Sequence, residues 1–445
     1  MIKLFIIFIQ LSILVFLGTL IINFSYPVSI ALEEVIISTS SSVIIFLLLT
    51  TVFLILFFQK ILFFIRQKFA ALKHSNRNNN YQKGYHAFTQ GMIALANKDH
   101  KKAILANKKL SKYLDDKSLS LLLMSETLKI EKKYSELEKV YQDMLKNDDT
   151  KTLGLKGLMN QSLQEQDYHH AFIYGEKLFN ENHQIDKLYE TLITIISKTN
   201  NWQKLIEINE KSLKNKIIDR QTYSLNQSIA FYEISKIKMH SDTSESIQLM
   251  EKALKLREFF PPYVCLYIDL LVEKNKLTLA KKYLFKAWSK NPHPEYKSKI
   301  KLLADKMGTA FNELAKYITK DTTSLSESKI LLAESLVEIE KWSDAKKIIS
   351  NLLEHKPSKE VCMLMSKIEE GDTNDPQKVN AWISRSNFGD LNKIWICSIT
   401  NISQTNWNSV GDSGYFNTLE WKNPKLISDL QPTNVETNII KYINN

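Results

Sequence analysis

The chain has 445 residues, of which 44% are hydrophobic and 24% charged, and its formal net charge is +11. It contains only 11 glycines and 9 prolines, and this shortage of chain breakers argues against a turn-rich β protein and favours long helices with short connections. The basic excess is rich in Lys with Glu interspersed and accompanies no nucleic-acid recognition motif, so we expect no nucleic-acid partner.

An uncharged apolar run, Leu4–Ile22, lies near the start of the chain. It is long enough to cross the hydrocarbon core of a bilayer as a helix. A cleaved signal peptide is the alternative, but the run is longer than the usual core of about 7–15 apolar residues, and no A-x-A-like cleavage site follows it. We therefore favour an uncleaved membrane helix.

A second apolar run, Ser42–Ile65, is also long enough to span a membrane. The stretch between the two runs contains two glutamates and no Lys or Arg. The basic residues from the end of the second run onward are Lys60, Arg66, Lys68, Lys73, Arg77 and Lys83. The positive-inside rule predicts that both flanks are cytoplasmic. If the first helix were cleaved as a signal peptide, the second would act as a stop-transfer segment, and the residues after it would still be cytoplasmic. We expect a two-helix anchor in the lipid bilayer at 1–65 and a basic juxtamembrane segment at 66–80.

A 34-residue spacing follows the anchor. Small or aliphatic residues recur at Ala103, Leu137, Ala171 and Leu205, and an aromatic residue or His stands three positions before each, at 100, 134, 168 and 202. Each step is 34 residues, which is the period of tetratricopeptide repeats, with one helix–turn–helix unit per repeat. Small residues suit the crossing point of the two helices, and a proline suits the end of the second.

Later units keep this pattern with drift. The matching positions are Ala280, Ala287 and Pro292 in one unit, and Ala333, Trp342, Ala345, Leu352 and Pro357 in another. The phasing weakens near Ile247, near Pro261–Pro262 and near Leu314. We predict tetratricopeptide-like helical repeats over 81–371, rather than unrelated amphipathic helices. Such arrays form a solenoid with a concave surface for peptides or protein partners.

The tail, residues 372–445, differs from the repeats. The sequence GDTNDPQ interrupts the helical pattern and predicts a linker. Beyond it, Trp395, Trp407, Phe416 and Trp421 alternate with turn residues. This spacing predicts one or two short hairpins held by aromatic side chains and packed on the last repeat. The expected fold class is therefore all-α, with two N-terminal transmembrane helices, a tetratricopeptide-type solenoid and a small irregular or β tail.

The layout of the tail is similar to that of a zinc ribbon, in which paired ligands stand at two knuckles. A structural zinc site needs four Cys or His ligands. Here only Cys397 is available, Thr400, Gly411 and Gly414 take the kinds of position that a ligand would take, and the tail contains no His. We expect a degenerate knuckle without a metal.

Candidate chemistry is sparse elsewhere. The sequence has no phosphate-binding glycine loop, nucleophile elbow or HExxH motif. Adjacent residues of a helix do not share a face, so His169 and His170 make a poor metal site. Cys265 lies in an apolar helix without a basic neighbour and is expected to be a core thiol. Trp202, Trp288 and Trp342 are expected at repeat-packing positions in the core. We predict no catalytic residue, no metal and no cofactor; the cofactor-binding residues, if any exist, are unknown. An enzyme with an unrecognised site is the remaining alternative.

The order of features along the chain resembles that of the HemY family of bacterial inner-membrane proteins. These features are two apolar spans, a basic segment after the second span, the run QKGYHAFTQGMIALANKDHKKA and the repeats. The protoporphyrinogen oxidase of the same name is a different protein. The match is most specific at Gly84, Ala87, Gly91, Leu95, Asp99 and Ala103. The resemblance implies a multi-pass protein of the bacterial inner membrane that acts in a late step of protohaem IX (porphyrin) biosynthesis. It brings no catalytic residue, and the sequence itself gives no evidence for contact with haem or a porphyrin.

These patterns lead to one functional hypothesis and one rival. The favoured hypothesis is a non-enzymatic, membrane-anchored scaffold whose repeats bind protein partners, namely enzymes of the tetrapyrrole pathway. The rival is a membrane-anchored repeat adaptor that regulates envelope or lipopolysaccharide assembly. The second span and the missing knuckle cysteines weigh against the rival.

Overall fold

The computed structural model describes residues 26–32, 35–114, 116–181, 185–354 and 357–424, with a few isolated residues between 8 and 19. Side chains are described in these ranges except at 30–37 and 68–78. The chain divides into two compact units, Met1–Lys133 and Tyr134–Asn445. The expected first membrane helix, Leu4–Ile22, lies outside the described residues apart from the isolated positions.

The first described element is a β-hairpin. Strands β1 (Pro27–Leu32) and β2 (Val35–Ser40) pair antiparallel, with Pro27 opposite Ser40 and Leu32 opposite Val35. The backbone amide of Ser41 donates to the carbonyl of Tyr26 at 2.9 Å. The hairpin therefore leads directly into the helix that follows.

Helix α2 (Ser41–Ala96) has 56 residues, and its part Ser41–Gln67 is apolar and long enough to cross a membrane. At 1.5 Å per residue, that part is about 40 Å long, which exceeds a hydrocarbon core of about 30 Å. Its large side chains face outward; Phe58 and Phe63 are each 63% exposed. Within the described residues it is the one candidate span. The expected spanning helix at Ser42–Ile65 is thus confirmed in length and composition, whereas the pair of spans is not.

Helix α2 continues without a break through the basic segment 66–80 into the first repeat. There it packs on α3 (His100–Tyr113), which is followed by α4 (Lys117–Glu131). A Cβ at Gly91 would lie 2.5 Å from the Leu123 side chain and 3.3 Å from Ala106. The prediction that small residues occupy the helix crossing of this repeat is therefore confirmed.

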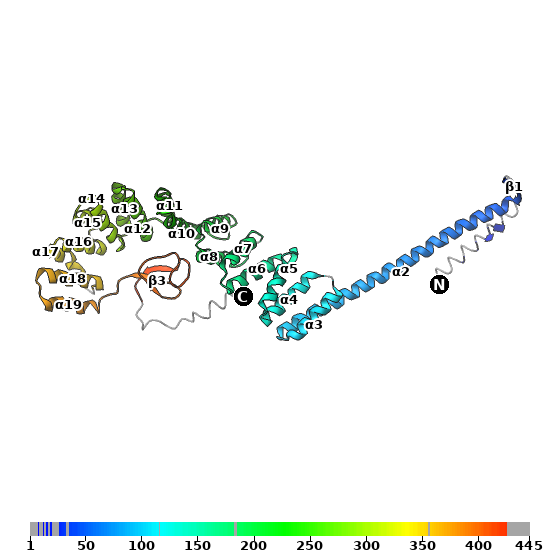
Figure 1. Cartoon of the computed structure of the whole chain (residues 1–445), viewed down its shortest axis with the longest axis horizontal. Helices are drawn as coiled ribbons and strands as arrows, with labels where there is room; N and C mark the ends of the chain where they lie inside the picture. Colours follow the sequence, from blue (N-terminus) through cyan, green and yellow to red (C-terminus); the bar gives the residue numbers. More distant parts are fainter. Residues whose placement is uncertain are drawn as a thin grey trace. The chain divides into compact units, whose positions relative to one another are not determined.

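The second unit is a series of helix pairs (Figure 1). The helices are α5 (Tyr134–Met144), α6 (Asp148–Gln164), α7 (Tyr168–Glu181), α8 (Leu188–Thr199), α9 (Trp202–Lys214), α10 (Arg220–Lys238), α11 (Thr243–Leu256), α12 (Pro261–Glu273), α13 (Leu277–Lys290), α14 (Tyr296–Met307), α15 (Phe311–Thr319), α16 (Ser326–Glu338), α17 (Trp342–Ile349), the short η1 (Ser350–Leu352), α18 (Lys359–Asp372) and α19 (Pro376–Ser386). Most of the contacts between helices join neighbours in the chain, as in a solenoid.

The first residues of the second helix in successive repeats follow the expected period. They lie at residues 100, 134, 168, 202, 243, 277, 311, 342 and 376, so the step is 34 except for 41 before α11 and 31 before α17. The four residues singled out in the sequence each begin a helix. The regions of weak phasing are regular pairs as well: α11, α13 and α15 start 34 residues apart. The longer step coincides with α10, which has 19 residues.

The segment GDTNDPQ, expected to be a linker, contains the end of α18, a turn over residues 373–375 and the start of α19. The Asp375 carboxylate accepts a hydrogen bond from the backbone amide of Gln377 at 2.9 Å and so caps α19, and Pro376 stands in the first turn. Proline is favoured there because its missing N–H would be unpaired in any case. A turn between two packed helices and a linker between domains have similar residues. The sequence alone therefore predicts a linker where the structure has a turn.

Residues 394–422 form a small module, called here the C-terminal module. Its strands β3 (Ile394–Cys397), β4 (Ser403–Gln404) and β5 (Leu419–Lys422) are antiparallel in the order β4-β3-β5. The predicted small β tail is therefore present. Its predicted position on the last repeat is wrong: Trp395, Trp407 and Leu419 belong to the hydrophobic core of the middle helices, α10 to α15. Only the preceding connection lies on the last pair, where the amide of Lys359 donates to the carbonyl of Asp390 at 2.9 Å.

Candidate protein interface

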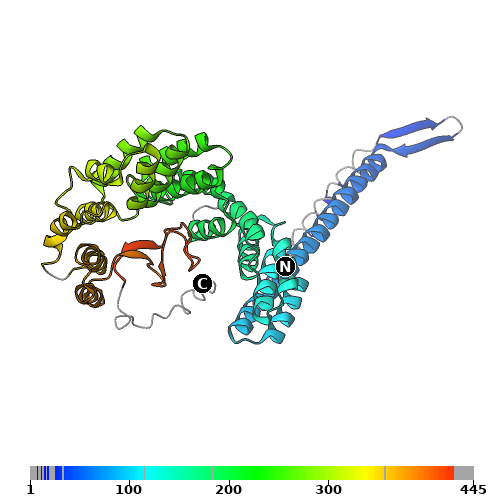
Figure 2. The same cartoon turned by 60° about the vertical axis from the view of Figure 1, so that its left-hand side comes forward.

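Three first helices of the middle repeats, α8, α10 and α12, each turn one face toward the C-terminal module. Tyr189 of α8, Tyr232 of α10 and Tyr263 of α12 lie on this inner face. In Figure 2 the module, drawn in orange, lies on the inner side of the arc formed by the green and yellow helices. The surface that a repeat array usually offers to a partner is here partly covered by the chain's own module.

Trp407 anchors the centre of the module. Its ring meets Phe260, Tyr232 and Tyr263 edge to face, at centroid distances of 5.1, 5.5 and 5.8 Å. It is only 4% exposed. Such aromatic pairs each contribute about 0.5–1.5 kcal/mol beyond the area they bury. The module is therefore part of the core of this unit rather than a loosely attached tail.

A second anchor joins Trp395 to the start of α14. The indole Nε1 of Trp395 donates to the Glu295 carboxylate at 2.5 Å. Burial raises the pKa of Glu295, although the Trp395 hydrogen bond and nearby Lys299 oppose the shift. A buried carboxylate is costly unless it is paired or hydrogen-bonded, so the indole gives this group the partner it needs.

His293 lies beside this anchor. Its ring is 4.5 Å from that of Trp421 and 6.3 Å from that of Trp395, centroid to centroid. Burial lowers the pKa of His293 to about 4, with a smaller contribution from Lys393. The ring is therefore neutral at physiological pH and acts as an aromatic surface for the module.

The far end of the module reaches α8 and α9. The ring of Phe416 packs on Trp202 with 6.3 Å between centroids. Gly414 has φ +78°, a left-handed conformation, and a Cβ there would lie 2.7 Å from the Lys198 ammonium. Glycine adopts this backbone without strain, so the turn can approach α8 closely.

The knuckle itself contains one thiol among hydroxyl groups. The Ser413 hydroxyl donates to Cys397 Sγ at 3.2 Å, and the Thr418 hydroxyl lies 3.3 Å from it. Burial raises the pKa of Cys397, but hydrogen bonds from Ser413, Thr400 and Thr418 outweigh this effect and lower it to about 6. No group of three His, Cys, Asp or Glu side chains suited to a metal occurs among the described residues. The described partners of the Cys397 thiol are thus hydroxyl groups.

Two cavities flank the module. The larger, about 530 Å³, lies between the module, α8 and α10. The other, about 380 Å³, lies between the module, α10, α12 and the start of α14, and includes the partly buried Cys265, Asp269 and Lys299. Burial raises the pKa of the Cys265 thiol far above its usual value, which makes it a poor nucleophile.

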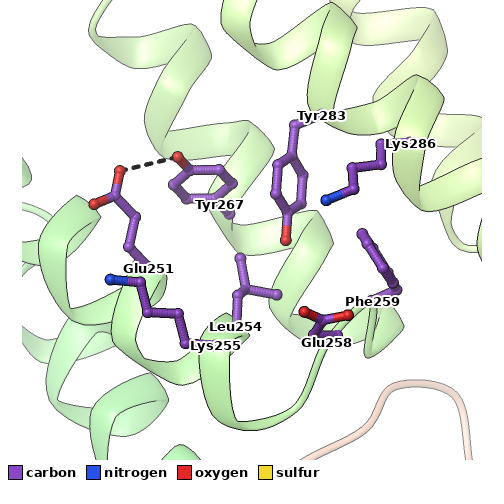
Figure 3. A pocket seen from close by; sticks show the side chains of 8 residues that line it. All are labelled: Glu251, Leu254, Lys255, Glu258, Phe259, Tyr267, Tyr283 and Lys286. Carbon is purple, nitrogen blue, oxygen red and sulfur yellow. Dashed lines mark hydrogen bonds between the residues drawn. The ribbon is translucent and has the colours of Figure 1, made fainter.

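A smaller pocket of about 230 Å³ lies between α11, α12 and α13 (Figure 3). Tyr267 donates to Glu251 at 3.1 Å, and the Lys286 ammonium lies 5.4 Å from the centre of the Phe259 ring. Burial raises the pKa of Tyr283 to about 12. Two glutamates and two lysines line the pocket, so its charge favours neither sign of ligand.

Beyond the module, an ionic cluster continues along α14, α16 and α18. The Lys297 ammonium lies 2.6 Å from Glu360 and 3.2 Å from Glu334. Lys297 is 15% exposed. Although burial opposes it, attraction by Glu334 and Glu360 raises the pKa of Lys297. The cluster ties three successive repeats together.

The residues singled out in the sequence are not brought together into one site. His170 contacts Asp167 at the start of α7 through its Nδ1, at 2.7 Å. Trp202 and Trp288 are buried, and Trp342 is partly buried against the core of the last helices. His293 and Glu295, which hold the module, were missed. The one local signal for them is the sequence NPHPEY, where two prolines restrict the chain just before α14.

Residues 27–130 match the family described as "HemY protein N-terminus". No curated protein matches this sequence. Among solved structures, the chain is similar to the TPR2AB domain–pHSP90 complex of yeast Sti1, at 8% identity and TM-score 0.30, with 69% of this chain and 99% of that chain covered. It is similar to Naa15/Naa10 bound to HypK-THB at 14% identity and TM-score 0.40, with 69% and 50% covered. It is similar to pilF of Pseudomonas aeruginosa at 12% identity and TM-score 0.21, with 62% and 98% covered.

Proposed function

We propose that the chain, whose residues 27–130 match the N-terminus of the HemY family, belongs to this family and is a non-enzymatic scaffold anchored in the bacterial inner membrane. Its repeats hold protein partners, enzymes of a late step of protohaem IX biosynthesis, at the cytoplasmic surface of the membrane. The haem-pathway part of this proposal comes from the family. The scaffold part comes from the helical repeats.

The observation that carries the proposal is the continuity of α2. A single helix of 56 residues contains both a membrane-long apolar part and the first helix of the repeats. A continuous helix holds the first repeat close to the bilayer. The basic residues that follow the apolar part favour a cytoplasmic position for the repeats. We propose two spans with both termini cytoplasmic, as the sequence predicts.

The C-terminal module changes where a partner would bind. Because it covers the inner face of α8, α10 and α12, we propose that partners contact the joint surface of module and repeats, rather than a bare concave groove. We therefore propose helical repeats over 81–386, in place of the expected boundary at 371, and a partner surface that combines their inner face with residues 394–422.

Two experiments test this proposal. In a strain that lacks the protein, porphyrin should accumulate relative to haem, and a normal ratio would remove the link to the pathway. A reporter that is active only in the periplasm should stay inactive when fused after Lys83, and activity there would overturn the cytoplasmic orientation.

A further inference from the structure

We propose that the cavity between the C-terminal module, α8 and α10 binds an extended peptide segment of a partner protein, in which aliphatic side chains stand next to a lysine or arginine. We call this cavity of about 530 Å³ the isoleucine groove. The inference rests on the proposed scaffold function and names the chemistry of the partner at one surface.

The first observation is the apolar lining. Ile193 comes from α8, Ile217 and Ile218 from the connection to α10, and Ile399 and Phe416 from the module. Ile399 is 44% exposed although it stands beside these other apolar groups. Covering such a surface is favourable because it removes apolar area from water. The groove therefore favours aliphatic side chains.

The second observation is the charge of the lining. Among the described side chains that line the groove, those of Glu190 and Asp219 are charged, and both are acidic. Hydrogen bonds from the backbone and side chain of Thr222 lower the pKa of Asp219, so it is ionised at neutral pH. A lysine or arginine beside the aliphatic side chains would complement this charge, whereas an acidic or phosphorylated segment would be repelled.

The third observation is that the polar side chains in one wall of the groove are hydrogen-bonded to one another. The Tyr189 hydroxyl donates to Asn209 Oδ1 and accepts from Asn226 Nδ2, both at 2.8 Å. Asn209 in turn donates to Gln227 at 2.8 Å. A closed network of this kind holds the wall in one conformation without a ligand, and a preformed site loses less free energy to ordering when it binds.

The groove also continues an interface that exists within the chain. Phe416 lines the groove and packs on Trp202 at 6.3 Å. The groove is thus formed jointly by repeats and module, at the edge where their shared core ends. Its size is within the range of about 300–1,000 Å³ typical of binding sites. Glu190, Thr194 and Ile399 leave it open to solvent, as an extended chain requires.

The test uses the full chain in detergent micelles and the peptide Gly-Ile-Leu-Lys-Ile-amide, which carries fluorescein on its amino terminus so that the lysine keeps its charge, with fluorescence anisotropy as the readout. The control peptide has Glu in place of Lys. Ile399→Ser should raise the dissociation constant about tenfold, because it removes apolar contact. Glu190→Gln should raise it about threefold, the effect of one exposed ion pair. Ile402→Ser is the matched control, since Ile402 is 48% exposed on the same module and lies outside the groove lining.

The proposal is supported if the Lys peptide binds more tightly than the Glu peptide and Ile399→Ser weakens binding while Ile402→Ser does not. It is overturned if neither peptide changes the anisotropy up to millimolar concentration, if the Glu peptide binds equally well, or if the two Ser variants have the same effect. A negative result here leaves the porphyrin ratio and the topology untouched, so failure of the peptide site is distinguishable from failure of the scaffold function.

Discussion

Trp395 and Glu295 are 100 residues apart in the chain and share a hydrogen bond of 2.5 Å between the indole Nε1 and the carboxylate. Glu295 stands just before α14, and Trp395 lies on β3. This contact, together with the rings around Trp407, places the C-terminal module on the inner face of the repeats. The module therefore shares the hydrophobic core of the repeats.

Trp395→Phe should destabilise the protein by about 1–3 kcal/mol, because it leaves the partly buried Glu295 carboxylate without its donor. Replacing both partners, as in Trp395→Phe with Glu295→Met, should cost less than Trp395→Phe alone, since no buried polar group is then orphaned. The free energy of unfolding of the full chain in detergent micelles measures both. A double variant that is as unstable as Trp395→Phe, or more so, would argue against this role of the pair.

Trp407→Ala should cost about 3–5 kcal/mol, because it removes a buried aromatic side chain and leaves a cavity. Ile402→Ala is the control: Ile402 belongs to the same module but is 48% exposed, so the expected change is below about 0.5 kcal/mol. The free energy of unfolding of the full chain in detergent micelles distinguishes the two variants. Equal stabilities for both variants would mean that the module does not share the core of the repeats.

Folding stability should depend on pH through His293. Burial lowers its pKa from 6.5 to about 4 in the folded protein, so the unfolded chain binds more protons between these values. The contribution of His293 is complete above pH 6.5 and is lost as the pH falls toward 4. His293→Gln should flatten the stability profile over this window. An unchanged profile in the variant would show that His293 does not titrate in this way.

Lys297→Met should destabilise the protein by about 1–3 kcal/mol, because Glu334 and Glu360 would be left partly buried without a cation. Lys301→Met is the matched control. Lys301 pairs with Glu338 one turn further along α14, but both side chains are well exposed, at 53% and 42%. An exposed pair contributes at most about 1 kcal/mol. The prediction fails if unfolding measurements give the two variants the same stability.

The elements with a local signal could be predicted from the sequence. The apolar part of α2 is a continuous run, and His100, Tyr134, Tyr168 and Trp202 start helices at a fixed spacing. Both patterns depend on neighbours that are close in the chain. The family match at residues 27–130 covers the same N-terminal stretch in which Gly84 to Ala103 carry the resemblance.

The position of the C-terminal module could not be predicted. Trp407 packs on Tyr232 and Phe260, and no periodicity connects residues so far apart in sequence. Its aromatic residues indicated that it would pack on some surface, but the last repeat and the inner face of the middle repeats offer similar apolar side chains in the sequence. In the structure, Trp395 is hydrogen-bonded to Glu295 and Trp421 packs on His293, and these contacts become visible only there.

Recovery of partners from the membrane tests the central claim most directly. The tagged full chain is purified from detergent-solubilised membranes, and the proteins that accompany it are identified and quantified for the wild type, Trp407→Ala and the Ile402→Ala control. The scaffold account predicts enzymes of the tetrapyrrole pathway with the wild type and the control, and a reduced yield with Trp407→Ala. Recovery of lipopolysaccharide-assembly proteins in their place would contradict it.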